Sequence, residues 1–178
     1  MRLFVALELP DAVRRELRSH CDAALPRPTG LRVTDPTLWH VTLAFYGEVD
    51  ESLLEPLGLR LQRAAARHPS PNLQVAGAGQ FGGRVLWAGV GGGVAGVRRL
   101  ADSVAAAGRR EGLDVEHRRY RPHVTLARSA VVSDLRELAA GFGDWQSSTW
   151  TADAISLFRS DLGPPVRHTV LATWPLAR

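Results

Sequence analysis

The same five residues, His-Val-Thr-Leu-Ala, occur twice in the chain, beginning at His40 in the first half and at His123 in the second. Each copy is rich in apolar and β-branched residues, which predicts a strand. Side chains alternate between the two faces of a strand. His40 and Thr42 are therefore expected on one face, with His123 and Thr125 on the equivalent face of the second copy. Each copy predicts an imidazole beside a hydroxyl.

This pair of motifs suits in-line displacement at phosphorus. A histidine with its ordinary pKa near ~6.5 can act as base or as acid at neutral pH. One of His40 and His123 could remove the proton from the incoming oxygen, and the other could protonate the leaving oxygen. The hydroxyls of Thr42 and Thr125 could donate hydrogen bonds to the phosphate. No His-Glu-x-x-His or similar spacing is present, so the pattern indicates chemistry without a metal.

The elements around the motifs alternate irregularly, with hairpin-length loops. This order predicts an α+β fold with mainly antiparallel sheet, in one domain over residues 1–178. We expect strands at 3–9, 31–33, 39–46, 73–76, 85–90, 123–127, 150–158 and 166–174, a glycine-rich turn at 77–83, and helices from Asp11 and at 50–67, 97–109 and 133–140.

The composition is that of an ordinary globular protein. Of its 178 residues 45% are hydrophobic and 22% charged, and no apolar run reaches the ~18 residues of a membrane span. The first residues do not form a signal peptide, so a cytoplasmic location and no membrane partner are expected. Cys21 is the single cysteine, which excludes an internal disulfide. All 22 basic residues are arginine and the net charge is +4, which permits a phosphate or nucleic-acid partner.

Three segments resemble one family: the opening RLFVAL at 2–7, HVTLAFYG at 40–47, and RPHVTLAR at 121–128. Paired His-x-Thr motifs in a chain of this size resemble the 2H phosphoesterase superfamily. Within it, the chain is most similar to the RNA 2′,3′-cyclic phosphodiesterases, also called 2′-5′ RNA ligases.

The resemblance implies two pseudo-symmetric lobes with helices outside and a central cleft, to which each lobe contributes one motif. It implies hydrolysis of an RNA 2′,3′-cyclic phosphate to a 2′-phosphate, with reversible 2′-5′ ligation as a further activity. In the family, His40 would donate a proton to the 3′ oxygen and His123 would activate water, while Thr42 and Thr125 hold the phosphate. Neither a metal nor another cofactor is implied.

The resemblance also implies a site for the terminal base. Arg128 would stack on one face of the base and Phe4 on the other. On a regular strand, alternation places Arg128 on the face opposite His123 and Thr125, which agrees with a role away from the phosphate. The alternatives are that Phe4 belongs to the core and that Arg128 is an ordinary surface charge.

The expected partner is an RNA with a 2′,3′-cyclic phosphate end, such as a tRNA fragment, bound by a monomer. Two other functions stay open: an RNA- or nucleotide-binding protein without significant turnover, and a phosphodiesterase for another cyclic nucleotide or an ADP-ribose cyclic phosphate. The glycines at 91–96 also fit a dinucleotide-binding pattern with Glu116 as its acidic residue. The chain lacks the regular strand-helix alternation of that fold, so this function is disfavoured.

Overall fold

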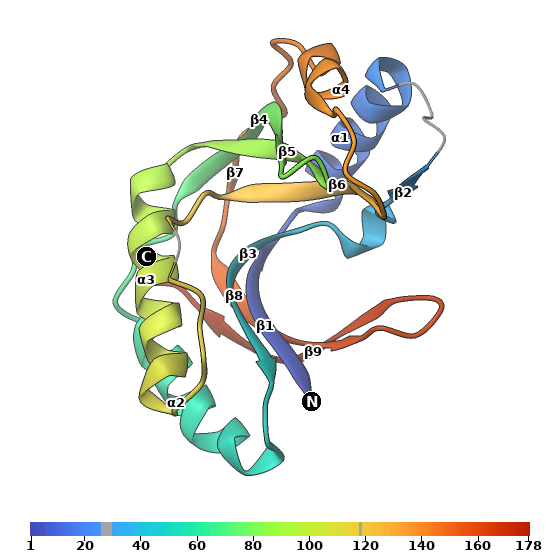
Figure 1. Cartoon of the computed structure of the whole chain (residues 1–178). Helices are drawn as coiled ribbons and strands as arrows, with labels where there is room; N and C mark the ends of the chain where they lie inside the picture. The colour runs from blue at the N-terminus through green and yellow to red at the C-terminus, as the bar shows by residue number, and fades with distance from the viewer. Residues whose placement is uncertain (26–29, 118) are drawn as a thin grey trace.

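Two strongly curled antiparallel sheets form the centre of the molecule (Figure 1), in a computed structural model that describes residues 1–25, 30–117 and 119–178. The first sheet has the order β3-β1-β8-β9 and the second the order β2-β6-β5-β4-β7. The strands are β1 (Arg2–Glu8), β2 (Leu31–Val33), β3 (His40–Glu48), β4 (Asn72–Phe81), β5 (Val85–Gly92), β6 (His123–Ser129), β7 (Trp150–Thr151), β8 (Ala154–Asp161) and β9 (Arg167–Pro175).

The sheets do not follow the two halves of the chain. Strand β2 belongs to the first half of the chain but pairs with β6 of the second half. Strands β8 and β9 form the last hairpin of the chain, and β8 pairs with β1. All strand pairs within the sheets are antiparallel. The α+β prediction is confirmed, with one histidine motif on β3 in the first sheet and the other on β6 in the second.

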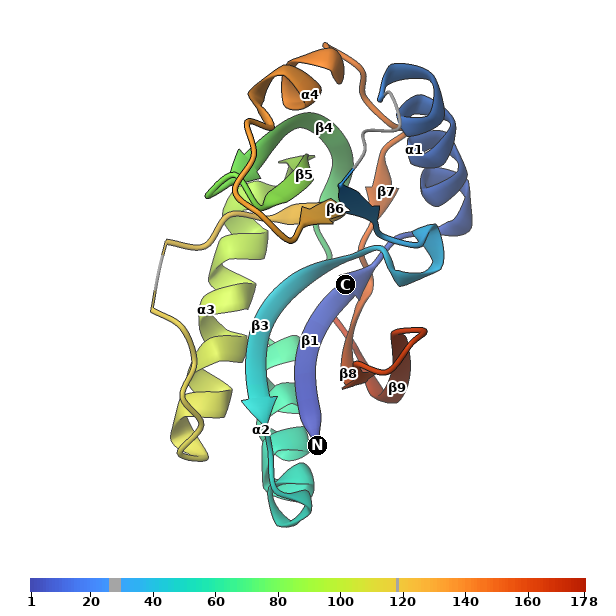
Figure 2. The same cartoon turned by 45° about the vertical axis from the view of Figure 1, so that its right-hand side comes forward.

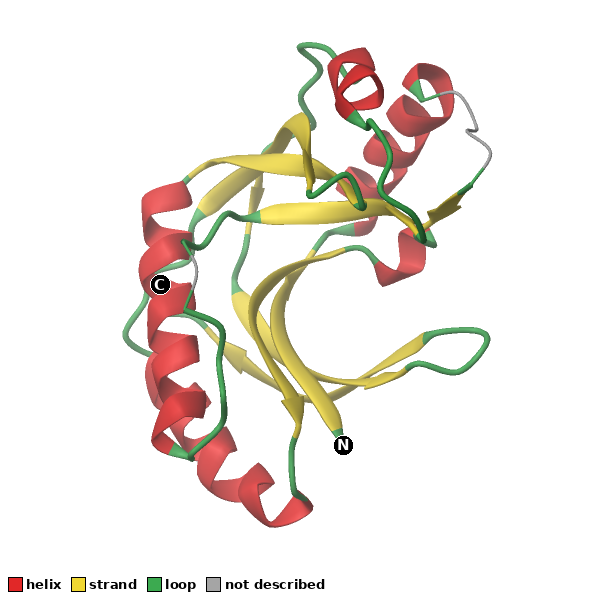
Figure 3. Ribbon diagram, in the orientation of Figure 1, coloured by secondary structure: helices red, strands yellow, loops and turns green. Residues whose placement is uncertain are grey.

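Helices lie outside the sheets (Figures 2 and 3). They are α1 (Asp11–Ala24), α2 (Leu54–Ala65), α3 (Val94–Arg110) and α4 (Arg136–Gly141), with short 3-10 turns η1 (Pro36–Leu38) and η2 (Glu51–Leu53). The single helix predicted at 50–67 is divided into η2 and α2. Pro56 falls in the first turn of α2, where its missing N–H costs no helical hydrogen bond. No helix in the described ranges has the length and apolar character that a membrane crossing requires.

One continuous apolar core joins both sheets and the helices. It contains Leu3, Val5 and Leu7, which share one face of β1. It also contains Val97, Leu100 and other buried residues of α3. A second, small cluster of Phe4, Ala6 and Phe158 lies on the other face of β1 and β8. The first sheet therefore has apolar side chains on both faces, and the second cluster faces the histidine motif of β3.

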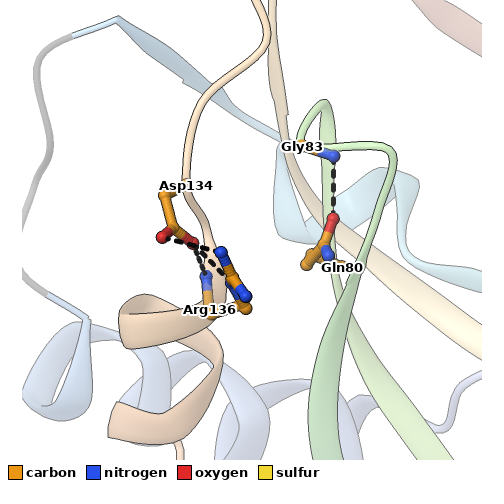
Figure 4. A network of polar contacts seen from close by, with 4 residues as sticks. All are labelled: Gln80, Gly83, Asp134 and Arg136. Atoms are coloured by element: carbon orange, nitrogen blue, oxygen red, sulfur yellow. Dashed lines mark hydrogen bonds and ion pairs between the residues drawn. The ribbon is translucent and has the colours of Figure 1, made fainter.

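The glycine-rich segment is a strand rather than the predicted turn at 77–83. Strand β4 runs to Phe81, and the chain reverses only at residues 82–84, where Gly82 and Gly83 have positive φ. Gln80 Oε1 closes this turn by accepting from Gly83 N at 2.7 Å, and Asp134 holds Arg136 nearby at the start of α4 (Figure 4). The predicted strand at 150–158 is also divided, because β7 pairs with β4 and β8 pairs with β1.

Candidate active site

The two motif strands place their histidines and threonines as the alternation predicts. Val41 and Val124 are fully buried in the core, whereas the His and Thr side chains are only partly buried. Strands β3 and β6 are in contact, and the charge of His123 acts on the imidazole of His40. The four side chains His40, Thr42, His123 and Thr125 define one surface, which we call the motif surface.

Both imidazoles are held in the same way. Nδ1 of His40 lies 2.7 Å from the carbonyl oxygen of Leu38, and Nδ1 of His123 lies 2.7 Å from that of Arg121. A carbonyl oxygen only accepts, so Nδ1 carries the proton in each ring. In the neutral imidazole this leaves Nε2 as the basic nitrogen. The two copies of the motif thus fix the same tautomer.

A tyrosine connects the two motifs. The hydroxyl of Tyr120, just before the second motif, donates to the carbonyl oxygen of Thr42 at 2.8 Å. On the other side of β3, the buried Tyr46 hydroxyl donates to the carbonyl oxygen of Val104 in α3 at 2.8 Å. Burial raises the pKa of both phenols well above the ordinary value, so both stay protonated donors at neutral pH. These bonds fix β3 relative to the second motif and to α3.

His40 is packed among aromatic rings. Phe4 stacks on it with ring centroids 4.7 Å apart, and His168 meets it edge-on at 5.4 Å. Burial lowers the pKa of His40 to about 4. The hydrogen bond to Leu38 opposes this shift, and the charges of His168, His123 and Arg128 add smaller decreases. The imidazole of His40 is therefore neutral at pH 7 in the unliganded protein.

His123 has different neighbours. Phe81 meets its ring edge-on at 5.0 Å, and the indole of Trp87 lies 6.1 Å away. The guanidinium of Arg121 lies over the same indole at 5.4 Å. Gly79 pairs with Trp87 across the ladder, and a Cβ at Gly79 would overlap the indole. This glycine makes room for the ring that supports His123.

Phe4 lies beside the motif surface but is covered. Its side chain is 4% exposed, and it stacks on Phe158 as well as on His40. The ring thus supports the His40 imidazole, and its role as a base-binding residue stays a prediction. The neighbouring aromatic on the same face is Phe45, which pairs with Phe4 across the ladder and is 40% exposed.

The placement of Arg128 by strand alternation is wrong. In the ladder between β5 and β6, Trp87 pairs with Thr125 and the adjacent residue Leu86 pairs with Ala127. Leu126 therefore has no partner on β5 and is an extra residue of β6. Such a bulge shifts the alternation by one. Leu126 and Ala127 are both buried, and Arg128 is exposed. Arg128 consequently lies on the face of His123 and Thr125 and not opposite to it.

The first motif carries the same bulge. Val5 pairs with Ala44 and Ala6 pairs with Thr42, which makes Leu43 the extra residue of β3. Leu43 and Ala44 are both buried, and Phe45 then points to the face of His40. Phe45 is therefore the counterpart of Arg128 in the first motif. Five identical residues produce the same local backbone twice, and the sixth differs.

His168 is a neighbour of the site that the sequence did not single out. It pairs with Ser160 on the closing hairpin and contacts both Phe4, at 4.9 Å, and His40. Burial lowers its pKa. Its position depends on β8 and β9 joining the first sheet, a long-range pairing with no local sequence signal. Within the described ranges, His, Cys, Asp and Glu side chains form no group of three or more that could hold a metal ion.

Comparison with known proteins places this arrangement in a family. The model of the 2′-5′ RNA ligase superfamily matches residues 15–164. The chain belongs to the 2′-5′ RNA ligase superfamily. This confirms the resemblance to 2H phosphoesterases.

Relatives of this superfamily member cover almost all of its length. A protein of Escherichia coli named RNA 2′,3′-cyclic phosphodiesterase is 30% identical over 99% of this chain and 97% of its own. One of Aeropyrum pernix with the same name is 34% identical over 74% of this chain and 78% of its own. The crystal structure of E. coli LigT complexed with 3′-AMP superposes with a TM-score of 0.82 at 28% identity, covering 99% of this chain and 98% of that chain.

The lowered pKa of His40 predicts a pH-dependent stability for this superfamily member. Between pH 6.5 and about 4 the unfolded chain binds a proton at His40 that the folded chain does not, so stability falls as the pH is lowered through this window. We expect His40 to contribute about 2 kcal/mol to the loss of unfolding free energy between pH 7 and pH 5. Urea unfolding at the two pH values measures this loss. His40→Gln should reduce this loss, whereas His117→Gln, at an exposed histidine, should not. Equal losses in the wild type and both variants would contradict the assignment of the pH dependence to His40.

Proposed function

We propose that the protein hydrolyses 2′,3′-cyclic phosphate ends of RNA to 2′-phosphates, with His40 and His123 as the proton-transferring groups. The observation that carries this proposal is the repeated geometry of the two imidazoles. The strands that carry the two rings are in contact, the charge of His123 acts on His40, and each ring has its Nδ1 on a backbone carbonyl. That arrangement provides one acid and one base for a single phosphate. The names of the Escherichia coli and Aeropyrum pernix relatives support the same substrate.

The reaction breaks the bond between phosphorus and the 3′ oxygen. Water attacks phosphorus as Nε2 of His123 removes its proton, and the bond from phosphorus to the water oxygen forms. The 3′ oxygen leaves and takes a proton from Nε2 of His40. Thr42 and Thr125 donate hydrogen bonds to the phosphate oxygens that do not leave. The same sequence with an RNA 5′-hydroxyl in place of water forms a 2′-5′ phosphodiester and is 2′-5′ ligation.

Substrate binding favours the protonated form of His40 that the acid role requires. His40 is neutral at pH 7 in the unliganded protein because burial lowers its pKa to about 4. An anionic cyclic phosphate beside the ring favours the imidazolium and raises that pKa. His40 therefore takes up a proton as the substrate anion binds and delivers it to the leaving oxygen. As the base, His123 would accept the proton of water at Nε2 of its neutral imidazole.

The physiological partner is an RNA end that carries the cyclic phosphate, such as a tRNA fragment, bound to a monomer in which residues 1–178 act as one domain. The test is incubation of the purified protein with a short RNA ending in a 2′,3′-cyclic phosphate, followed by identification of the phosphate position. A 2′-phosphate product is expected. Binding without turnover would favour a binding protein, and faster hydrolysis of another cyclic nucleotide or of an ADP-ribose cyclic phosphate would favour a different substrate.

We expect hydrolysis to proceed without a divalent metal ion. The two imidazoles perform both proton transfers, and the threonine hydroxyls supply the phosphate contacts, so no step needs a Lewis acid. The rate in EDTA should equal the rate in magnesium. Activity that EDTA abolishes and that magnesium or zinc restores would contradict this prediction.

A further inference from the structure

Three arginines gather beside the motif surface, at the ends of the two bulged strands. Arg32 on β2 and Arg128 on β6 are direct partners in the ladder, so their side chains share one face. Arg2 belongs to β1, in the other sheet, and its guanidinium lies over the ring of Phe45 at 4.6 Å. Partial burial lowers the pKa of Arg128, and the like charges of Arg32 and Arg2 lower it further. The cluster thus joins the two sheets.

In the part of the chain that the structure describes, no ion pair joins a carboxylate to Arg2, Arg32 or Arg128. Glu48, the ladder partner of Arg2, forms its ion pair with the N-terminal ammonium group instead. Like charges directly opposite each other on neighbouring strands are destabilising. An anion bound among the three guanidinium groups would offset this repulsion, and arginine binds phosphate oxygens in a forked, two-point geometry.

The position of the cluster relative to the motifs defines the anion. Arg128 follows Thr125 by three residues on β6, which is roughly 10 Å along an extended strand. Phe45 follows Thr42 by the same interval on β3, and Arg2 covers it. Arg32 pairs directly with Arg128 and lies beside it at the same level, whereas Arg2 lies two residues beyond Phe4, the ladder partner of Phe45. Both arginines therefore flank the level of Phe45 and Arg128, which follows that of His and Thr. A nucleoside whose cyclic phosphate sits at the motif surface would extend over this interval of about 10 Å.

We infer that Arg2 and Arg32 bind the phosphodiester on the 5′ side of the terminal nucleotide, so that the RNA leaves the motif surface past Phe45 and Arg128. The inference rests on the proposed function. It adds the path along which the RNA leaves the site, and it names the 5′ phosphodiester as the group by which the protein distinguishes an RNA end from a mononucleotide. A negatively charged peptide would meet the same cations but would not need a cyclic phosphate at its end. The position next to the motif surface favours RNA.

Three substrates test the inference. They are adenosine 2′,3′-cyclic phosphate, the dinucleotide ApA with a 2′,3′-cyclic phosphate, and the same dinucleotide with an uncharged methylphosphonate linkage. Wild type should show a higher kcat/KM for the charged dinucleotide than for the other two. In Arg2→Gln and Arg32→Gln the ratio of kcat/KM for the charged dinucleotide to that for the mononucleotide should fall by about 10-fold, the worth of a weak charge-assisted contact. Arg98→Gln, on the exposed face of α3, removes the same charge and should leave the ratio unchanged.

The outcomes separate this inference from the proposed function. Equal kcat/KM of wild type for the charged and uncharged dinucleotides, or a ratio that Arg2→Gln and Arg32→Gln leave unchanged, would overturn the inference while hydrolysis of a cyclic phosphate stands. Hydrolysis of none of the three substrates would overturn the proposed function. The inference would then be decided by titration calorimetry with ApA 2′-phosphate, which wild type should bind more tightly than the methylphosphonate form. Thermal unfolding of each variant shows that a changed ratio does not arise from a changed fold.

Discussion

Replacing either His40 or His123 by alanine is expected to lower kcat by about 10²–10⁴-fold, the usual contribution of one general acid or base. The physical reason is that each imidazole has one task at a single phosphate, and a water molecule performs that task poorly. The double variant should be little slower than the slower single variant, because groups that act together in one step are not additive. Single-turnover hydrolysis of a short RNA with a cyclic phosphate end measures these rates.

The controls for this prediction separate a loss of catalysis from a change in packing. His40 packs against Phe4, so His40→Ala leaves space beside an aromatic cluster, and His40→Gln serves as a variant of closer size. His117→Ala removes an exposed histidine outside the motifs and should keep the full rate. Circular dichroism should show a native fold for every variant. Near-normal activity in either motif variant, or an equal loss in His117→Ala, would contradict the assignment of the two histidines.

The motif faces could be predicted from the sequence because alternation is a local property. His40 and Thr42 precede the bulge, and so do His123 and Thr125, so their common face follows from strand period alone. Beyond the bulge the same rule fails. Arg128 lies on the face opposite to the one that alternation assigns, since Leu126 is an extra residue that no composition or spacing rule marks.

The surroundings of the histidines could not be predicted, because they depend on which strands become neighbours. Phe4 and His168 are more than 160 residues apart in the chain, and they meet at 4.9 Å only because β8 and β9 pair beside β1. The lowered pKa of His40 follows from that packing and not from the motif. The glycine-rich β4 shows the same effect, since the indole of Trp87 covers Gly79 and a segment that is typical of turns becomes a strand.

The bulge at Leu126 makes the role of Arg128 the decisive question for substrate recognition. On the corrected face, the Arg128 guanidinium lies within electrostatic range of His40 and three residues beyond Thr125, so it could contact either the terminal base or the phosphate. The proposed function already assigns the two histidines and two threonines to the phosphate, whereas Phe45 is an exposed aromatic at the equivalent position of the other strand. We therefore expect Arg128 to stack on the base.

Arg128→Ala should then weaken substrate binding by about 5- to 150-fold, the range that corresponds to a stacking energy of 1–3 kcal/mol per base. An RNA whose terminal nucleotide is abasic should bind wild type more weakly by a similar factor, and the variant should lose little further affinity for it. Strong non-additivity between the enzyme change and base removal is the expected signature of direct contact. Phe4→Ala and Phe45→Ala, measured with the same two RNAs, show which aromatic shares the base with Arg128. If the loss in Arg128→Ala is equal for the intact and the abasic RNA, the guanidinium acts on the phosphate, as the bulge permits, and the base lies elsewhere.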